Sequence, residues 1–187
     1  MTKKIALIDV DEVLVESGKR WLAWLVVNAD PNMPPEAITK MASMYNMNEA
    51  VLPYLPPDFD PMGFWHCDKL YDDMWPRNDA LSGLLTLKDA GYDLYAVTFC
   101  IGNHFSSKAN FIEKNFSNVF NDMIATGSKH LVRGDLVIDD RMKYLKPFPS
   151  ETIKILFKSP YAQCTDGHPD FVMDGWKDIG RILEQIE

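Results

Sequence analysis

The sequence predicts an α/β fold with a parallel sheet of about five strands, helices on both faces of the sheet, and a small helical cap. Apolar runs of strand length alternate along the chain with longer segments of helical period. One stretch rich in methionine, tryptophan and proline interrupts this alternation directly after the first strand. Because strands that alternate with helices form a parallel, Rossmann-like sheet, we expect the interrupting stretch to be an insertion that covers one edge of it.

The core of this fold is expected from residues 1–14 and 78–187, and the cap from residues 15–77. A chain of 187 residues is long enough for one domain with an inserted subdomain. The inserted stretch holds four of the five tryptophans and two segments with a helical pattern, residues 19–30 and 35–46.

The core elements can be placed from apolar runs and capping residues. Gly91 is expected to end the helix before the second strand, and Ser106 or Ser107 to begin the helix after it. The last helix is amphipathic and carries Trp176 on its apolar side. The expected strands are residues 4–10, 92–98, 121–127, 134–140 and 152–157, and the expected core helices are residues 78–91, 106–116 and 174–187.

Composition disfavours several classes of function. The net charge of −8 and the isoelectric point near 5.0 disfavour binding to nucleic-acid polymers, which requires a basic face. The three cysteines are widely spaced and form no CxxC pair, which is typical of a reducing compartment. The apolar runs at residues 5–8 and 21–27 are too short for a signal peptide or a membrane span. We therefore expect a soluble cytoplasmic protein with a small-molecule partner and no membrane, and the sequence leaves open whether it forms a homodimer.

Two pairs of carboxylates follow apolar runs that are far apart in the sequence. Asp9 and Asp11 follow the first expected strand, and Asp139 and Asp140 follow the fourth. Carboxylates are seldom buried unless they are paired or bind a cation. Since ligands bind at the carboxyl edge of open parallel sheets, the two pairs predict one magnesium site that handles phosphate. In such a site one carboxylate attacks phosphorus and its neighbour gives a proton to the leaving oxygen.

Four short segments, in this order, resemble the four motifs of the haloacid dehalogenase-like (HAD) superfamily of aspartate-dependent phosphohydrolases. They are DVDEV at residues 9–13, AVT ending at Thr98, Lys129 in GSKHLV, and IDD at residues 138–140. The resemblance implies that Asp9 is the nucleophile and that Asp11 is the general acid/base, whose backbone carbonyl also ligates magnesium. It further implies that Thr98 and Lys129 contact the phosphate, and that the metal site is formed by Asp9, Asp11, Asp139 and Asp140.

A closer resemblance, to the 5'(3')-deoxyribonucleotidases, covers the opening strand and most of the chain after about residue 61. It is carried by the GFW element at residues 63–65, by Lys129 ten residues before the acidic pair in GDLxIDD, and by Trp176 in the last helix. It implies a magnesium-dependent phosphomonoesterase that releases phosphate from (deoxy)nucleoside monophosphates through an aspartyl-phosphate.

Aromatic side chains of the cap are candidates for contact with a base, because aromatic faces stack on nucleobases. Phe64 and Trp65 are favoured, since they form the GFW element, whereas the helical spacing of Trp21 and Trp24 favours core packing. The aromatic residues considered are Trp21, Trp24, Tyr45, Phe64, Trp65, Tyr71 and Trp75.

Two residues depart from the family pattern. Glu12 stands where the family commonly has glycine, and it either repels phosphate or turns outward. Phe99 stands where many relatives have a small hydroxyl residue, so backbone amides near Gly102 and a helix N-terminus are expected to replace that contact. Lys108 competes with Lys129 for the phosphate-neutralising role, and Phe99 and Lys108 are kept as substrate-binding candidates.

Two other functions stay open at this point. The same chemistry could act on a sugar phosphate or another small phosphate ester. A catalytically weakened relative that binds a phosphorylated ligand or a protein would also keep most of the motifs, and Glu12 and Phe99 are the residues in its favour.

Overall fold

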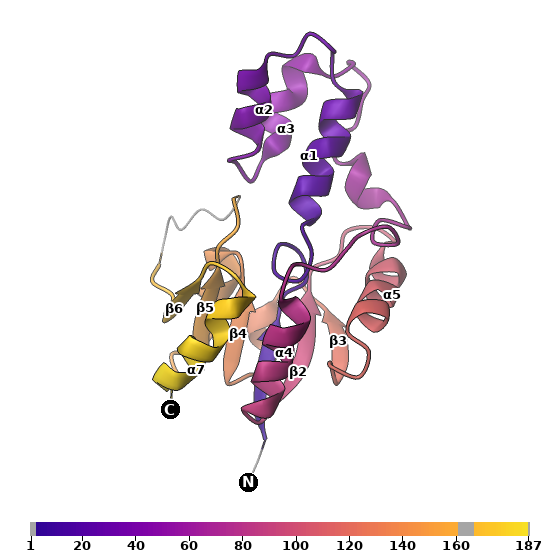
Figure 1. Cartoon of the computed structure of the whole chain (residues 1–187). Coiled ribbons are helices and arrows are strands. Elements are labelled where there is room, and N and C mark those ends of the chain that lie inside the picture. Colours follow the sequence, from indigo (N-terminus) through magenta and orange to yellow (C-terminus); the bar gives the residue numbers. More distant parts are fainter. Residues whose placement is uncertain (1–2, 161–166, 187) are drawn as a thin grey trace.

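The computed structural model describes residues 3–160 and 167–186. Within them the chain forms a six-stranded sheet with the order β3-β2-β1-β4-β5-β6 (Figure 1). All neighbouring strands run parallel, so their carboxyl ends lie along one edge. The strands are β1 Lys4–Ile8, β2 Tyr92–Thr98, β3 Asp122–Ala125, β4 Leu136–Asp139, β5 Ile153–Phe157 and β6 Phe171–Met173.

Helices cover both faces of the sheet, as predicted. Side chains alternate between the two faces along a strand. Ile8 of β1 belongs to one buried cluster with Leu84 and Ile182 of two core helices, and Leu7 belongs to a second cluster with Leu145 of another. The core helices are α4 Ala80–Asp89, α5 Phe105–Asn115, α6 Met142–Leu145 and α7 Ile179–Ile186, with short 3-10 turns at Lys129–Leu131 and Trp176–Asp178.

The α/β fold class is confirmed, and the differences from prediction concern the ends of elements and one strand. β2 has the predicted bounds, and Gly91, in the left-handed region with a φ of +88°, ends α4. The prediction that Ser106 or Ser107 begins α5 is wrong, because the helix begins at Phe105 with His104 at the N-cap position. β6 was not expected, since its three residues are too few to show a strand period.

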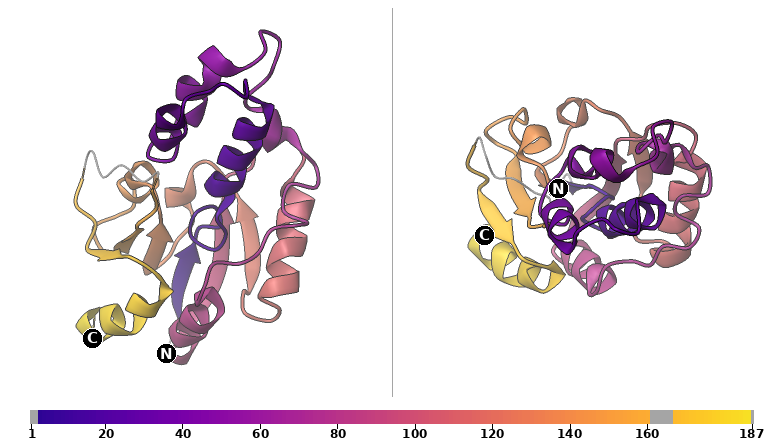
Figure 2. Two further views of the ribbon diagram at one scale, coloured as in Figure 1. Left: turned by 45° about the horizontal axis from the view of Figure 1, so that its top comes forward. Right: turned by 90° about the horizontal axis from the view of Figure 1, so that it is seen from above.

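The helices within residues 15–77, called the cap below, stand beyond the carboxyl edge of the sheet, and the view from above shows them over the strands (Figures 1 and 2). The two connections of the cap to the core run side by side. Val15 and Pro76 form an antiparallel bridge, and the N–H of Arg77 donates to the carbonyl oxygen of Leu14 at 2.8 Å. The cap contains α1 Ser17–Asn28, α2 Pro35–Met41, α3 Met47–Val51 and 3-10 turns at Leu52–Tyr54 and Gly63–His66.

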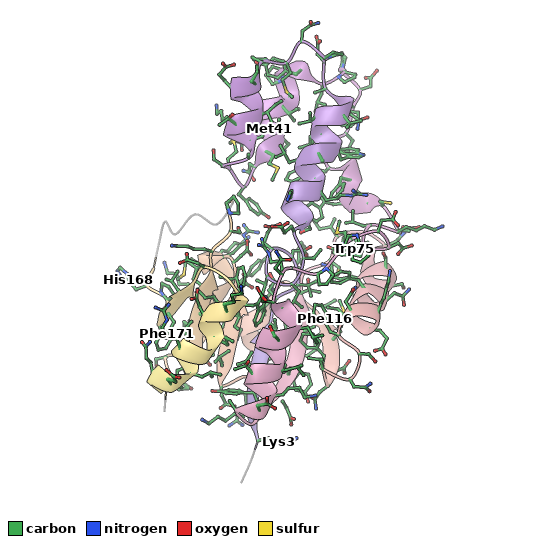
Figure 3. All side chains as sticks on the ribbon, in the orientation of Figure 1. Lys3, Met41, Trp75, Phe116, His168 and Phe171 are labelled. Carbon is green, nitrogen blue, oxygen red and sulfur yellow. The ribbon has the colours of Figure 1, made fainter. Side chains whose placement is uncertain are left out.

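The apolar side chains of the cap belong to the same buried cluster as Ile8 and Leu84 of the core. Leu25, Met41, Met47 and Val51 are almost completely buried in it, and Figure 3 marks Met41 between the cap helices. Methionine is unbranched and flexible, so it fills the irregular space between short helices. None of the helices within residues 3–160 and 167–186 combines the length and apolar character needed to cross a lipid bilayer.

Candidate active site

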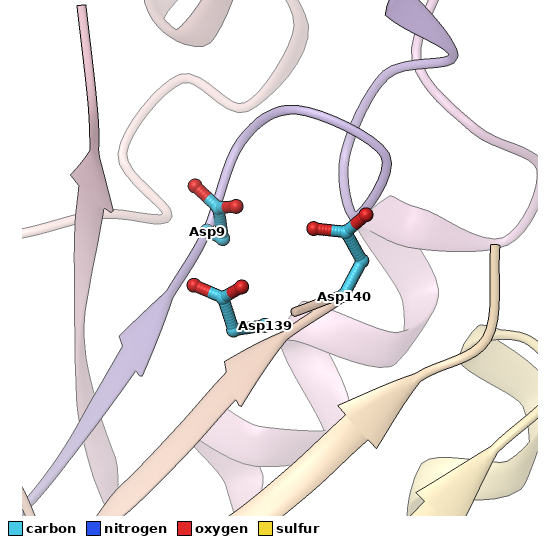
Figure 4. A group of neighbouring side chains, drawn as sticks. All are labelled: Asp9, Asp139 and Asp140. Carbon is cyan, nitrogen blue, oxygen red and sulfur yellow. The ribbon is translucent and has the colours of Figure 1, made fainter. Parts of the chain in front are cut away.

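Three carboxylates meet at the carboxyl edge of the sheet, between β1 and β4. Asp9 directly follows β1, Asp139 ends β4, and the N–H of Asp9 donates to the carbonyl oxygen of Ile138 at 2.9 Å. One oxygen atom each of Asp9, Asp139 and Asp140 lies within 4.8 Å of the others, and Figure 4 shows the three side chains facing a common space. All three residues are buried, with exposed fractions of 6%, 0% and 4%.

Lys129 is the cation that pairs with this group. Its Nζ lies 2.7 Å from Oδ1 of Asp9 and 2.6 Å from Oδ2 of Asp139, and the residue is 2% exposed. Burial acts to lower the pKa of Lys129, but attraction to Asp139 and Asp9 outweighs burial and raises it. Lys129 therefore keeps its proton, and its ammonium group is a positive charge in contact with Asp9 and Asp139.

One lysine does not balance three buried carboxylates. Burial raises the pKa of Asp9 to about 7, against the attraction of Lys129, and repulsion from Asp139 adds to the rise. Burial, with repulsion from Asp139 and Asp9, raises the pKa of Asp140 well above its usual value. The three carboxylates supply the oxygen ligands that Mg²⁺ prefers, so the residues fit a hard divalent cation.

Asp11 lies apart from this group of three carboxylates and has its own partners. Lys108 donates to Oδ2 of Asp11 at 2.6 Å, and the hydroxyl group of Tyr71 donates to Oδ1 at 2.6 Å. Burial acts to raise the pKa of Asp11, but Lys108 and the hydrogen bond from Tyr71 lower it overall. The side chain of Asp11 is thus not one of the clustered carboxylates, and the role predicted for its backbone carbonyl as a magnesium ligand stays a prediction.

Lys108 connects Asp11 to the end of β2. It is fully buried, and its Nζ also donates to Oγ1 of Thr98 at 2.9 Å and to the carbonyl oxygen of Phe99 at 3.2 Å. Lys108 and Lys129 therefore hold different carboxylates, Asp11 and Asp9, and both reach the site. The sequence had set the two lysines against each other for one role.

A cavity of about 200 Å³ lies between the sheet edge and the cap. Six of the candidate residues line it, namely Asp9, Asp11, Trp65, Phe99, Lys129 and Asp140. The other four, Phe64, Thr98, Lys108 and Asp139, lie outside the lining and are buried.

The two favoured aromatic residues of the cap have different positions. Trp65 lines the cavity, whereas Phe64 packs behind it, edge-on at 5.1 Å between ring centroids, and against Trp24 at 5.9 Å. Trp21 also lines the cavity, and its Nε1 donates to the carbonyl oxygen of Pro61 at 2.9 Å. Trp21 is therefore both a packed residue and part of the cavity wall.

Sequence reasoning did not consider several residues of the cavity wall, among them Tyr144 and His104, and it misjudged Tyr71, which lies outside the wall. Tyr71 was considered for stacking, but it is 1% exposed and its hydroxyl group contacts Asp11 instead. Tyr144 stands four residues after the acidic pair, a spacing that could have suggested it, whereas nothing local links Tyr71 to Asp11, 60 residues away.

Arg141 joins the core to the cap across this cavity. Its Nη1 donates to the hydroxyl oxygen of Tyr45 at 2.6 Å, and its guanidinium lies 3.8 Å from the centroid of the Tyr45 ring. Both residues line the cavity. The backbone N–H of Arg141 donates to Oδ1 of Asp139 at 2.9 Å, so one residue contacts both the acidic pair and the cap.

Glu12 turns into the molecule, so the outward alternative is wrong. It is 7% exposed, accepts a hydrogen bond from the N–H of Gly18 at 2.6 Å, and pairs with Arg77 at 3.0 Å. Burial raises its pKa to about 7, although Gly18 and Arg77 both favour the charged form. Its φ of +60° lies in the left-handed region, which gives a physical reason for the glycine that the family commonly has here.

Comparison with known proteins identifies a family. The family model described as "5' nucleotidase, deoxy (Pyrimidine), cytosolic type C protein" matches residues 3–185. Proteins named 5'(3')-deoxyribonucleotidase from Bacillus subtilis (strain 168) and from Bacillus phage SPbeta are each 25% identical over 186 residues, which cover 97% of this chain and 99% of theirs.

A solved structure supports the fold independently. The HAD-type protein YfnB of Bacillus subtilis, determined with bound magnesium, superposes with a TM-score of 0.62 at 12% identity, over 98% of this chain and all of that one. The chain therefore belongs to the family of deoxy (pyrimidine), cytosolic type C 5' nucleotidases, which are hydrolases of phosphoric monoesters within the HAD superfamily.

Proposed function

We propose that this enzyme releases phosphate from (deoxy)nucleoside monophosphates in a magnesium-dependent reaction that passes through an aspartyl-phosphate. The observation that carries the proposal is the position of Asp9, whose carboxylate lies among Asp139, Asp140 and Lys129 at the wall of a cavity between sheet and cap. The matching family and the printed names of the Bacillus and phage relatives support a nucleotide as the substrate.

The carboxylates of Asp9, Asp139 and Asp140 would hold the Mg²⁺ ion, and the resemblance adds the backbone carbonyl of Asp11. When bound, the cation offsets the repulsion between these carboxylates and the incoming phosphate. The excess of buried negative charge over the single ammonium group of Lys129 supports this assignment.

Asp9 and Asp11 divide the chemical work in this proposal. Asp9 attacks phosphorus, the ester P–O bond breaks as the Asp9–phosphorus bond forms, and Asp11 gives a proton to the leaving oxygen. Asp11 then takes a proton from the water molecule that hydrolyses the aspartyl-phosphate. Lys129, 2.7 Å from Asp9, keeps the nucleophile oriented and favours its ionised form.

Lys108 and Thr98 would form the second contact with the phosphate. The ammonium group of Lys108 has three donor hydrogens, which it shares among Asp11, Thr98 and the carbonyl oxygen of Phe99. A phosphate oxygen can replace one of these acceptors without leaving the lysine unpaired. Lys108 and Lys129 then act on one phosphate from two sides.

We further propose that residues 15–77 act as a cap domain over a core of residues 1–14 and 78–187. In this proposal the base lies against Trp65 of the cap and Phe99 of the core, since both line the cavity. Phe64 contributes by holding the ring of Trp65 from behind.

A cytoplasmic location completes the proposal. Cys67 and Cys100 are free thiols, which supports a reducing compartment, and Cys164 lies outside the described residues. The sequence leaves open whether the protein forms a homodimer. Light scattering of the purified protein, with 21.4 kDa per chain, distinguishes one chain from two.

The direct test is phosphate release from a panel of substrates with and without Mg²⁺, comparing the wild type with Asp9→Asn. The panel contains deoxynucleoside 5'- and 3'-monophosphates, the matching ribonucleotides and ribose 5-phosphate. We expect Asp9→Asn to be slower by about a thousandfold or more, because the nucleophile is lost. Asp58→Asn, an exposed change in the cap, is the matched control and should keep full activity.

Each alternative has its own outcome in this experiment. Equal phosphate release by the wild type and Asp9→Asn contradicts the mechanism. Equal rates on nucleotides and ribose 5-phosphate contradict the base pocket and favour another small phosphate ester. Ligand binding without turnover favours the catalytically weakened relative.

A further inference from the structure

We propose that Tyr71 is a positioning residue for Asp11. Its hydroxyl group holds Oδ1 of Asp11, so that Oδ2 is the oxygen that exchanges a proton with the leaving group. The inference rests on the proposed function, because it concerns the residue that the proposal makes the general acid/base.

The two oxygen atoms of Asp11 have different hydrogen-bond donors. Tyr71 donates to Oδ1 at 2.6 Å and Lys108 donates to Oδ2 at 2.6 Å. The side chain of Asp11 is 25% exposed and lines the cavity. Tyr71 is 1% exposed and does not line the cavity, so its hydroxyl group reaches Asp11 and not the substrate.

Tyr71 is fixed at both its backbone and its ring. Its N–H donates to Oγ of Ser107 at 2.9 Å, and the hydroxyl of Ser107 donates to Asp72 at 2.6 Å. The ring centroid of Tyr71 lies 5.6 Å from that of His104 and 6.2 Å from that of Phe111. A ring held from these sides cannot turn freely, so its hydroxyl group is a stationary anchor for Asp11.

Lys108 has other acceptors besides Asp11. It is fully buried and also donates to Thr98 and to the carbonyl oxygen of Phe99, and in the proposed reaction the hydrogen that it gives to Asp11 turns toward the phosphate. Oδ2 of Asp11 then faces the leaving oxygen. Once Lys108 donates to the phosphate, Oδ2 no longer accepts a hydrogen bond from it, whereas Oδ1 still accepts one from Tyr71, so the proton of the carboxyl group belongs on Oδ2.

Tyr71→Phe tests this role, because it removes one oxygen atom and keeps the ring. The measurement is kcat/KM with two substrates, thymidine 5'-monophosphate and p-nitrophenyl phosphate. The nucleotide leaves as an alkoxide that needs a proton, whereas nitrophenolate leaves without one. We expect kcat/KM to fall about tenfold or more for the nucleotide and less than about threefold for p-nitrophenyl phosphate, because general acid catalysis matters only for the first.

Two further variants keep the test decisive. Tyr92→Phe changes a buried tyrosine at the start of β2, the end of that strand opposite to Thr98, and should leave both values unchanged. Ser107→Ala removes the acceptor of the Tyr71 N–H. It should lower kcat/KM for the nucleotide more than kcat/KM for p-nitrophenyl phosphate, as Tyr71→Phe does. If Tyr71→Phe does not fold, as judged by its thermal unfolding midpoint, the ratio of the two kcat/KM values in Ser107→Ala tests the positioning role in its place.

The possible failures can be told apart. An equal fall for both substrates, or no fall for the nucleotide, overturns the positioning role while the proposed function stands. No Asp9-dependent phosphate release by the wild type from either substrate overturns the proposed function, and this inference with it.

Discussion

Glu12 and Arg77 form an ion pair, with 3.0 Å between Oε2 and Nη2, across the two segments that join the cap to the core. Their side chains are 9% and 16% exposed. Glu12 also accepts the N–H of Gly18 in the first turn of α1, where a negative charge is favoured by the helix dipole. One carboxylate therefore ties the first cap helix to the segment that returns to the sheet.

Arg77→Met is expected to destabilise the fold by about 3 kcal/mol, because a buried carboxylate loses its counter-charge. The free energy of unfolding is measured in urea at pH 8, where Glu12, with a pKa of about 7, is mostly ionised. The double variant Glu12→Gln/Arg77→Met should recover part of the loss, since it removes the unpaired charge. Equal stabilities for the single and double variants would contradict this account.

Glu12→Gly is expected not to increase phosphate release, although it restores the residue that the family commonly has. The carboxylate is already neutralised by Arg77 and bound by Gly18, so it does not act as a free charge against the phosphate. Initial rates with a deoxynucleoside monophosphate, for the wild type and Glu12→Gly side by side, measure the effect. A tenfold or greater increase, on the order of one lost charge repulsion, would instead favour a catalytically weakened wild type.

The features that could be predicted from the sequence are those that depend on local patterns, namely the strands and the carboxylates at their ends. The apolar runs before Asp9 and Asp139 indicated two strands of one parallel sheet, and the structure pairs these strands and places both residues at one sheet edge. The contacts that orient the site are not local. Tyr71 and Lys108 stand 60 and 97 residues from Asp11, and periodicity and spacing carry no information about such pairs.

Contacts between residues far apart in the sequence also explain why the predictions for Ser107 and Phe64 differ from the structure. Ser107 resembles a helix N-cap, but its hydroxyl group is used between Tyr71 and Asp72, which are 36 and 35 residues away. Phe64 belongs to a family element, yet only packing decides that Trp65 faces the cavity and Phe64 stands behind it.

Lys129→Met is expected to lower kcat by about 100-fold or more, because the charge that orients Asp9 is lost. The same change should strengthen Mg²⁺ binding, since the three carboxylates lose their only internal cation among the described contacts. Isothermal titration calorimetry with Mg²⁺ measures the affinity. Lys114→Met, an exposed change on α5, serves as the control, and weaker Mg²⁺ binding by Lys129→Met would refute the argument.

His104 is expected to make the fold less stable as the pH falls through about 6.5, its unperturbed pKa. Burial lowers the pKa of His104 in the folded state, against the hydrogen bond to the carbonyl oxygen of Trp65 at 2.8 Å. The unfolded chain therefore takes up a proton that the folded chain does not, and the free energy of unfolding decreases on the acid side.

His104→Asn isolates this contribution, because asparagine keeps a side-chain N–H donor for Trp65 and does not titrate. Denaturant unfolding of both proteins from pH 5 to 8 gives the difference in stability at each pH. The wild type should lose stability relative to the variant below about pH 6.5. A difference that stays constant over this range would exclude His104 as the cause.

Asp140→Asn is expected to have opposite effects on stability without and with Mg²⁺. Burial and repulsion from Asp139 and Asp9 raise the pKa of Asp140 well above its usual value, so its charge is unfavourable in the folded protein without a cation. The neutral variant should therefore unfold at a higher temperature than the wild type in EDTA.

Added Mg²⁺ should raise the thermal unfolding midpoint of the wild type, since a ligand that binds only the folded state stabilises it. It should raise the midpoint of Asp140→Asn much less. Asp174→Asn changes an exposed carboxylate that is not part of the cluster and should respond to Mg²⁺ like the wild type. Equal Mg²⁺ responses of the wild type and Asp140→Asn would show that Asp140 is not a ligand.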